Sequence, residues 1–299
     1  MFKDKTLLIT GGTGSFGNAV LEKFLHSEIK EIRIFSRDEK KQHDMRVLYK
    51  NDKLRFHIGD VRDFDSVNAA MQGVDYVFSA AALKQVPSCE FYPINAMGMS
   101  KALMEKVAVA MSRNVPADGT VVSVTRYGNV MSSRGSVIPL FVEQIKNGAP
   151  ITITDPDMTR FMMSLPDAVE LVMFAFENGQ QGDTFVQKSP AATIMTLAEA
   201  LKELFNADNE IRIIGTRHSE KKHETLLSRE ELLKADDLGN YFRVPADNRD
   251  LNYARFFEKG QTKLSMEEDY TSGNTHILDK QEMMALLLST EFIQSELAT

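Results

Sequence analysis

Short apolar segments alternate with amphipathic segments along the first half of the chain. Runs rich in Leu, Ile, Val and Phe lie at 5–10, 31–35, 53–58 and 75–79. The intervening segments at 18–25, 38–50 and 63–72 carry their apolar residues at helical spacing. Because strands alternate with helices, the pattern predicts an α/β fold of the Rossmann-like, doubly wound kind, with a parallel sheet covered on both faces.

The pattern changes after a long helix predicted at 95–113, which Asn95 caps. A strand at 120–125 and a helix at 138–147 follow, and beyond residue 150 the predicted elements become shorter. The strands there are expected at 151–154, 184–187 and 211–214, and the helices at 165–178, 196–206 and 228–235. The stretch 240–299 is polar with scattered aromatic residues. We therefore expect a cofactor-binding domain at 1–150 and a smaller substrate-binding subdomain at 151–299, partly interleaved with the first.

Composition narrows the class of partner. The 299 residues can bury a large core, and their net charge of -7 argues against binding to nucleic acid or to a membrane surface. No apolar run approaches the roughly 20 residues that span a bilayer, and the first residues are charged, so we expect a cytoplasmic protein. The one cysteine, Cys89, forms no internal disulfide, and the six histidines lack metal-site spacing, so no metal is expected.

A glycine cluster separates the first predicted strand from the first predicted helix. Gly12, Gly14 and Gly17 match the spacing G-x-G-x-x-G, and Gly11 adds the spacing G-x-x-G-x-x-G. Glycines at this position let the backbone approach a pyrophosphate, which the helix N-terminus also attracts. The residues predicted to bind a dinucleotide here are Gly11, Thr13, Gly14, Ser15, Phe16 and Gly17.

The end of the second predicted strand indicates which dinucleotide is preferred. NAD-binding proteins of this type carry an acidic residue there, whereas this chain has Ser36 and Arg37, followed by Lys41. A hydroxyl and a guanidinium suit a 2′-phosphate, so the sequence predicts NADP, while Asp38 leaves NAD as the alternative. Further contacts are predicted at the ends of the third and fourth strands. Asp60 and Val61 would flank the adenine, and Ala80, Ala81 and Ala82 would lie under the cofactor.

Several motifs resemble those of one enzyme family. They are GGTGSFG at 11–17, IFSRDEKK at 34–41, AAALKQVP at 80–87, PINAMGMSK at 93–101, RYGNV at 126–130, RGSVIP at 134–139 and TDPDMTRF at 154–161. They are similar to UDP-N-acetylglucosamine 4,6-dehydratases of the inverting, capsular-polysaccharide type, which belong to the extended short-chain dehydrogenase/reductase family. The resemblance implies an NADP-dependent lyase that also epimerises C5 and makes a UDP-4-keto-6-deoxy-acetamido-hexose for surface polysaccharide. It also implies a homo-oligomer.

The resemblance implies site residues as well. Most short-chain dehydrogenases use the tyrosine of a Tyr-x-x-x-Lys motif, and here Met97 stands at the tyrosine position while Lys101 keeps the lysine. A thioether does not accept a proton, so Met97 at most packs beside the nicotinamide, and Lys101 contacts the cofactor. The UDP-sugar is expected at Lys84, Asn129, Arg134, Arg160, Arg217 and Glu220. Among these, Arg160 and Arg217 would hold the diphosphate.

The sequence departs from this family at one point. Relatives carry a further helix and a strand ending in Thr-Asp-Lys, but here residues 89–93 run directly into 94–97, so about one helix-strand unit is absent near 90–94. In relatives that strand lies between the strands equivalent to 75–79 and 120–125. A folded deletion variant, a sequence with residues missing and an inactive relative all remain open. Two other functions also stay open, namely a nucleotide-sugar epimerase or reductase and a catalytically impaired NADP-binding protein.

Overall fold

The computed structural model describes residues 1–82, 96–116, 118–133, 135–216, 220–246 and 268–298. It divides into two compact units, Met1–Val107 and Ala108–Thr299. The expected division at residue 150, with the cofactor on one side and the substrate on the other, stays a prediction about function. Each unit has its own sheets.

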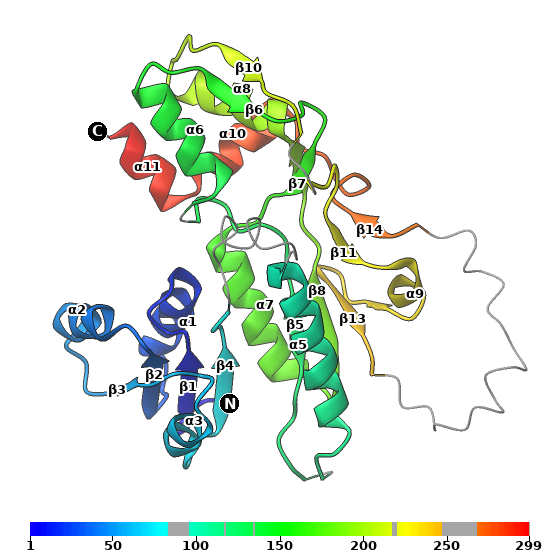
Figure 1. Cartoon of the computed structure of the whole chain (residues 1–299). Helices are drawn as coiled ribbons and strands as arrows, with labels where there is room; N and C mark the ends of the chain where they lie inside the picture. The colour runs from blue at the N-terminus through cyan, green and yellow to red at the C-terminus, as the bar shows by residue number, and fades with distance from the viewer. Residues whose placement is uncertain (83–95, 117, 134, 217–219, 247–267, 299) are drawn as a thin grey trace, which may run out of the picture. The chain divides into compact units, whose positions relative to one another are not determined.

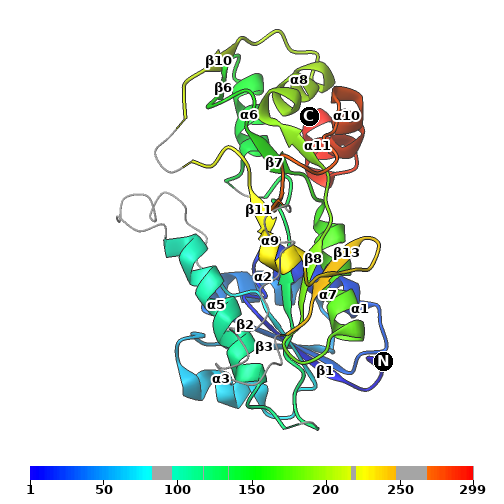
Figure 2. The same ribbon diagram turned by 90° about the vertical axis from the view of Figure 1, so that its right-hand side faces the viewer.

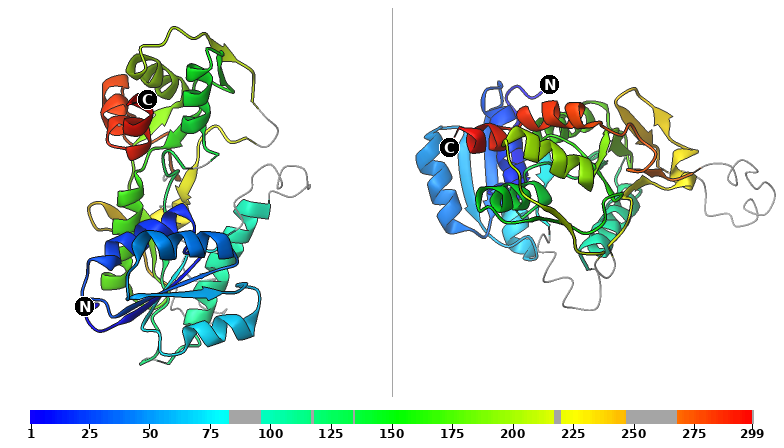
Figure 3. Two further views of the ribbon diagram at one scale, coloured as in Figure 1. Left: turned by 90° about the vertical axis from the view of Figure 1, so that its left-hand side faces the viewer. Right: turned by 90° about the horizontal axis from the view of Figure 1, so that it is seen from above.

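The first unit contains a four-stranded parallel sheet. Its strands are β1 (Thr6–Thr10), β2 (Glu31–Ser36), β3 (Leu54–Ile58) and β4 (Tyr76–Ser79), in the order β3-β2-β1-β4. The helices between them are α1 (Ser15–Leu25), α2 (Glu39–Tyr49) and α3 (Phe64–Met71). Figures 1 and 3 show α1 and α2 on one face of the sheet and α3 on the other. The predicted Rossmann-like, doubly wound fold is therefore confirmed.

The strand register aligns the carboxyl ends of the four strands. Thr10, the last residue of the fully buried β1, pairs with Phe35 of β2 on one side and with Ser79 of β4 on the other. Ser36, which ends β2, pairs with Ile58, which ends β3. Because all four strands run in the same direction, the glycine turn after β1 and the residues after β2, β3 and β4 follow the same edge of the sheet.

The helix α5 (Ala96–Ser112) carries the chain from the first unit into the second. There β5 (Val124–Arg126) pairs in parallel with β8 (Thr184–Gln187), and β13 (Tyr241–Val244) and β12 (Asp236–Asp237) add antiparallel strands. The helix α7 (Leu165–Asn178) packs on this sheet, where its Leu171 and Ala175 form an apolar cluster with Phe185 of β8. It begins with a capping box of Ser164 and Asp167, with Pro166 in its first turn.

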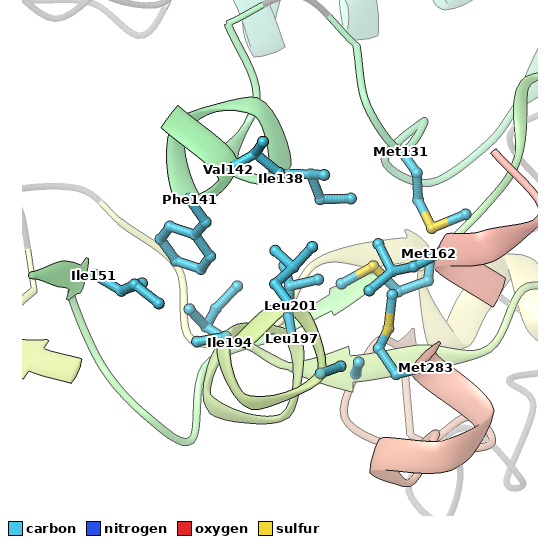
Figure 4. Close-up of a cluster of buried hydrophobic side chains, with 14 of the residues drawn as sticks. Met131, Ile138, Phe141, Val142, Ile151, Met162, Ile194, Leu197, Leu201 and Met283 are labelled. Atoms are coloured by element: carbon cyan, nitrogen blue, oxygen red, sulfur yellow. The ribbon is translucent and has the colours of Figure 1, made fainter. Parts of the chain in front are cut away.

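The larger apolar core of the Ala108–Thr299 unit includes residues of α6 (Val137–Lys146), α8 (Ile194–Leu204), α10 (Lys280–Leu288) and α11 (Glu291–Leu297). The short strands of this unit pair as β6 (Ile151–Ile153) with β10 (Ile211–Ile213), β7 (Thr159–Phe161) with β9 (Ala191–Thr193) and β11 (Thr225–Leu227) with β14 (Tyr270–Thr271). The short helix α9 (Arg229–Leu232) contacts β11, and its Leu232 packs in a separate apolar cluster. Figure 2 shows α8, α10 and α11 side by side, and Figure 4 shows Phe141, Leu197, Leu201 and Met283 meeting in the core.

Some elements differ from those predicted. The strand expected at 120–125 forms only from Val124 onward, because the backbone of Val122 bonds instead to the loop after α7, donating to Gln181 Oε1 and accepting from Gly182 N. The described parts of 240–299 contain β13, β14, α10 and α11, none of which was expected. Asn95, the predicted helix cap, lies outside the described residues. Within the described ranges, every helix is too short or too polar to cross a membrane.

Candidate functional site

The glycine turn after β1 is folded tightly against its surroundings. Gly11 has a positive φ of 69°, and a Cβ built on it would lie 2.9 Å from the Ala81 nitrogen. A Cβ on Gly17 would lie 2.6 Å from the Gly12 Cα, so α1 approaches the turn closely. The turn is closed by the Gly14 nitrogen, which donates to the Gly11 carbonyl at 2.9 Å. Only glycine fits these positions, which leaves the backbone uncovered by side chains.

The first turn of α1 favours an anion. Its N-cap is Gly14, which supplies no side-chain hydrogen bond, and the first turn carries no acidic residue. By contrast, α2 and α7 are capped by Asp38 and Ser164. Because the first N–H groups of a helix carry a partial positive charge, an uncapped glycine start is suited to a phosphate group.

Ser36 is fixed at the end of β2 by two neighbours. Its carbonyl accepts from the Gly59 nitrogen at 3.1 Å and from Gln42 Nε2 at 3.2 Å. Its hydroxyl Oγ also lies 3.2 Å from Gln42 Nε2. The hydroxyl is therefore held at the carboxyl edge of the sheet rather than rotating freely.

A carboxylate and two guanidinium groups lie after β2 and β3. Asp60 accepts from Arg62 through Nε at 3.0 Å and Nη2 at 2.6 Å, while Arg37 Nη1 lies 3.4 Å away. The side-chain hydrogen bonds from Arg62, and then its backbone N–H, hold the pKa of Asp60 well below its usual range. Arg62 donates hydrogen bonds to both carboxylate oxygens of Asp60. Arg37, whose side chain is 70% exposed, therefore keeps most of its N–H donors available for another acceptor.

Asp38, which left NAD open as a ligand, is engaged in capping. Its Oδ1 accepts from the Lys41 nitrogen at 3.0 Å, and its Oδ2 lies 3.3 Å from Lys41 Nζ. The backbone hydrogen bond from Lys41 lowers the pKa of Asp38, which stays ionised at neutral pH. A ribose hydroxyl would therefore compete with the helix cap for this carboxylate.

The other predicted cofactor residues lie on the same unit. Ala80 and Ala81 pack under Gly11, and the Ala80 nitrogen donates to the Thr10 carbonyl. Val61 is 47% exposed beside Asp60. Met97 and Lys101 are both in α5, four residues apart, and Lys101 is exposed. Nothing is described for the side chain of Met97.

The second unit brings Arg160 and Glu220 together. Arg160 Nη2 lies 3.9 Å from Glu220 Oε1, and its Nε lies 3.7 Å from Glu224 Oε1. The Arg160 guanidinium is 15% exposed and also donates to the carbonyls of Thr159 and Lys221. The planar guanidinium is thus held between backbone carbonyls and two carboxylates.

Next to Arg160, polar side chains link three segments of this unit. Thr159 Oγ1 lies 2.7 Å from His223 Nδ1 and 2.7 Å from Ser272 Oγ, and Ser272 is fully buried. Asn129 is exposed, and its carbonyl accepts from the Met163 nitrogen at 3.3 Å. The predicted substrate residues Asn129, Arg160 and Glu220 thus belong to one unit, although their role stays a prediction.

Some predicted residues cannot be placed, and some relevant residues were not predicted. Lys84, Arg134 and Arg217 lie outside the described residues. Gln42, Arg62 and Glu224 were not singled out from sequence, because each is an ordinary polar residue on a helix or loop. Arg62 alone had a local signal, since it follows the predicted adenine contacts Asp60 and Val61 directly. No group of three or more potential metal ligands occurs in the part of the chain that is described.

Family models match almost the whole chain. One described as polysaccharide biosynthesis protein matches residues 7–95 and 91–246, and one described as the C-terminal part of such proteins matches 247–294. Proteins named UDP-glucose 4-epimerase from Rickettsia akari (strain Hartford) and Rickettsia prowazekii (strain Madrid E) are 57% and 56% identical to this chain. Each alignment covers 99% of both chains.

The alignment with the Rickettsia akari protein is longer than this chain. It runs over 338 positions, whereas the chain has 299 residues, so at least 39 aligned positions have no residue here. The two segments of the family match meet at 91–95, next to the point where the sequence indicates an absent helix-strand unit. In the described residues β4 pairs only with β1 and β5 only with β8, so each ends its sheet.

Solved structures resemble this one along most of its length. Pen from Bacillus thuringiensis has a TM-score of 0.83 and 32% identity, and the match covers 97% of this chain and 99% of that chain. WbmF from Bordetella bronchiseptica, solved in complex with NAD+, has a TM-score of 0.60 at 15% identity, covering 72% and 83%. UDP-N-acetylglucosamine 4-epimerase from Methanobrevibacter ruminantium M1 has a TM-score of 0.56 at 19% identity, covering 74% and 88%. The latter two support the fold alone.

Proposed function

The chain belongs to the polysaccharide biosynthesis protein family, and on that premise we propose that it binds NADP and acts on UDP-N-acetylglucosamine as a 4,6-dehydratase that also epimerises C5. The observation that carries the proposal is the pairing of an uncapped glycine turn after β1 with a fixed hydroxyl and an exposed guanidinium after β2. The coarser assignment, an enzyme family of nucleotide-sugar epimerases and dehydratases, rests on the relatives.

The residues of the first unit fit a dinucleotide. Gly11 and Gly17 leave no room for a Cβ, so the residues after β4 and the helix α1 pack closely against the turn. Gly14 leaves the start of α1 without a side-chain cap, so a pyrophosphate can take that role. Ser36 and Arg37 would then face the 2′-phosphate of the adenosine, to which both can donate hydrogen bonds.

The proposed reaction has no net redox change. The nicotinamide supplies temporary storage of a hydride, taken from C4 and returned to C6. The C4 ketone acidifies the C5 proton, the C6 hydroxyl leaves as water, and C5 is reprotonated on the opposite face. The ammonium of Lys101 would hold the nicotinamide ribose, while Arg160, with Glu220 beside it, would bind the diphosphate of the substrate.

A second candidate is a UDP-hexose 4-epimerase that uses NAD or NADP. The names of the Rickettsia relatives favour it, and it needs the same oxidation at C4 without loss of water. Asp38, the N-cap of α2, keeps NAD as the alternative cofactor. The products of the two reactions differ at C6, because only the dehydratase removes the C6 oxygen, which leaves as water.

The absent helix-strand unit bears on turnover. Relatives place the Thr-Asp-Lys segment there, and the longer alignment together with the divided family match supports its absence from this chain. Without those groups to transfer protons at C5 and C6, we expect weak or no dehydration despite intact NADP binding.

Incubation of the purified chain with NADP and either UDP-N-acetylglucosamine or UDP-glucose tests the proposal by proton NMR. A C6 methyl signal from UDP-N-acetylglucosamine, slow but enzyme-dependent, supports the dehydratase. A C4 epimer without a methyl signal supports the second candidate. Neither product from a chain that binds NADP would contradict both activities and leave a catalytically impaired NADP-binding protein. Neither product and no binding of NADP would contradict that interpretation as well.

A further inference from the structure

Gln42 is a buried polar residue next to the proposed 2′-phosphate site. It lies in the first turns of α2, and only 1% of it is exposed. Its Nε2 lies 2.8 Å from the His57 carbonyl, 3.2 Å from the Ser36 carbonyl and 3.2 Å from Ser36 Oγ. One side-chain amide therefore joins the ends of β2 and β3.

The surroundings fix which way the Gln42 amide points. The carbonyl oxygens of His57 and Ser36 can only accept, so the atom facing them must be the donor Nε2. Its Oε1 is buried and has no hydrogen-bond partner among the described residues. A buried acceptor without a donor is unfavourable, so an apolar side chain of the same size would suit packing better. We therefore look for the role of Gln42 in the groups that its Nε2 contacts, which are His57 and Ser36.

The Gln42 amide also sets the direction of the Ser36 hydroxyl. Gln42 Nε2 has two hydrogens for three acceptors, so the hydrogen that is not directed at the His57 carbonyl is shared between the carbonyl and the Oγ of Ser36. Nε2 only donates, so the hydrogen of the Ser36 hydroxyl must be donated elsewhere. The Ser36 carbonyl is already occupied by Gly59 and Gln42, so the residue is fixed through backbone and side chain alike. A phosphate oxygen only accepts hydrogen bonds, and a hydroxyl held as a donor is matched to it.

We propose that Gln42 is a positioning residue for cofactor specificity, which orients the Ser36 hydroxyl as a donor to the 2′-phosphate of NADP. This inference rests on the proposed dinucleotide site and adds to it a residue that makes no contact with the ligand. Helix α2 does not depend on Gln42 for its start, because Asp38 caps it. Loss of the amide should therefore act on the hydroxyl rather than on the helix.

Isothermal titration of NADP and NAD into the nucleotide-free full chain tests this role. Gln42→Met keeps the length and volume of the side chain but removes the donor. We expect the Kd for NADP to rise about tenfold and the Kd for NAD to change less than about threefold. Gln42→Asn, which withdraws the amide by one methylene, should change the ratio in the same direction and serves if the methionine variant does not fold.

Gln144→Met is the matched control. Gln144 links α6 to β6 through an amide that bonds to Thr152 Oγ1 at 2.9 Å and to the Thr152 nitrogen at 3.1 Å, in the second unit. Its loss should lower thermal stability and leave the ratio of the two Kd values unchanged. An equal weakening of NADP and NAD in Gln42→Met would show a merely structural role and overturn the proposal.

A double-mutant cycle with Ser36→Ala gives the second readout. If Gln42 acts through the Ser36 hydroxyl, Gln42→Met should not alter the NADP-to-NAD ratio further once that hydroxyl is gone. Additive effects of the two substitutions would overturn the inference. Absence of any dinucleotide binding by the unmodified chain would instead contradict the proposed function itself, which keeps the two failures distinct.

Discussion

Asp60 is one carboxylate in contact with two guanidinium groups, and this excess of positive charge favours phosphate binding. Two guanidinium groups, those of Arg37 and Arg62, surround one carboxylate, so a positive charge is left over after β2 and β3. Arg62 makes the shorter contacts and thereby neutralises Asp60. Arg37 remains exposed and available to a second anion.

Replacement of Arg37 by Met should therefore weaken NADP selectively. We expect its Kd to rise by about 10- to 100-fold, because a charge-assisted hydrogen bond to the phosphate is lost, while the Kd for NAD stays nearly constant. Titration calorimetry at low and high salt measures both values. Arg55→Met removes an exposed cation of β3 and is the control. A similar loss of NADP affinity in that variant would mean that only overall charge matters.

Acid should destabilise the first unit through His57. Burial, and then the charge of Arg33, lower the pKa of His57 below its usual value. The unfolded chain then binds the proton more readily, so stability is lost as the pH falls through about 6.5, the unfolded pKa, toward the folded value. Melting temperatures between pH 8 and pH 5 should decline less in His57→Gln than in the unmodified chain. His43 on α2 is exposed, so His43→Gln is the control and its melting temperature should decline as that of the unmodified chain does. A decline in His57→Gln as large as in this control would refute the prediction.

The residues of the proposed cofactor site differ in how clearly the sequence indicates them. Ser36 and Arg37 were identifiable because their place after a strand gives them a defined relation to the glycine turn. Gln42 was not, because its role depends on the carbonyl of His57, fifteen residues away, and no spacing rule joins the two. Asp38 was considered as a ribose ligand, and only the geometry of α2 shows it engaged as a helix cap.

At the scale of elements, the turn between β1 and α1 combines two constraints. Gly11 and Gly73 both have positive φ, at 69° and 72°, but only Gly11 is packed against backbone, since nothing lies within 4 Å of a Cβ on Gly73. Substitution of Gly73 therefore tests the effect of positive φ alone, whereas substitution of Gly11 adds a steric clash.

Gly11→Ala should destabilise the protein by about 3 kcal/mol and abolish dinucleotide binding, because Ala81 leaves no room for a methyl group. Gly73→Ala should cost only about 1–2 kcal/mol, from φ alone, and bind normally. Urea unfolding and calorimetry measure the two effects. Normal binding by Gly11→Ala would show that the tight turn is not needed for the ligand.

The regular elements of the first unit were predictable, whereas short strands were predictable only in part. The strands and helices of the first unit repeat their apolar residues clearly enough to be placed within a few residues. The strands expected at 151–154, 184–187 and 211–214 form as β6, β8 and β10. Strands β7 and β9 were not expected, because three residues each are too few to establish an alternation. Helix α10 did carry a signal, since Asp279 and Glu282 form a capping box at its start, but the polar surroundings of 240–299 obscured it.

At the scale of the whole molecule, the absent helix-strand unit is the main departure from the relatives. At least 39 aligned positions of the Rickettsia akari protein have no counterpart here. The departure was visible in sequence only through the resemblance, since composition and periodicity carry no record of residues that are not there. Its consequence is expected in catalysis rather than in cofactor binding.

Insertion of the corresponding segment from the Rickettsia akari protein near residue 93 should restore turnover. We expect a rise of about 100-fold in sugar conversion over the unmodified chain if that segment carries the proton-transfer groups that the resemblance implies. A Gly/Ser segment of equal length is the control and should give no increase. High activity of the unmodified chain, equal to that of the chimera, would show that the unit is dispensable.

Titration of the purified, nucleotide-stripped chain with NADP and with NAD tests directly whether Ser36 and Arg37 select the phosphorylated dinucleotide. We expect one binding site per chain and a lower Kd for NADP than for NAD, because both residues would contact the extra phosphate. Equal affinities, or no uptake of either dinucleotide, would contradict it.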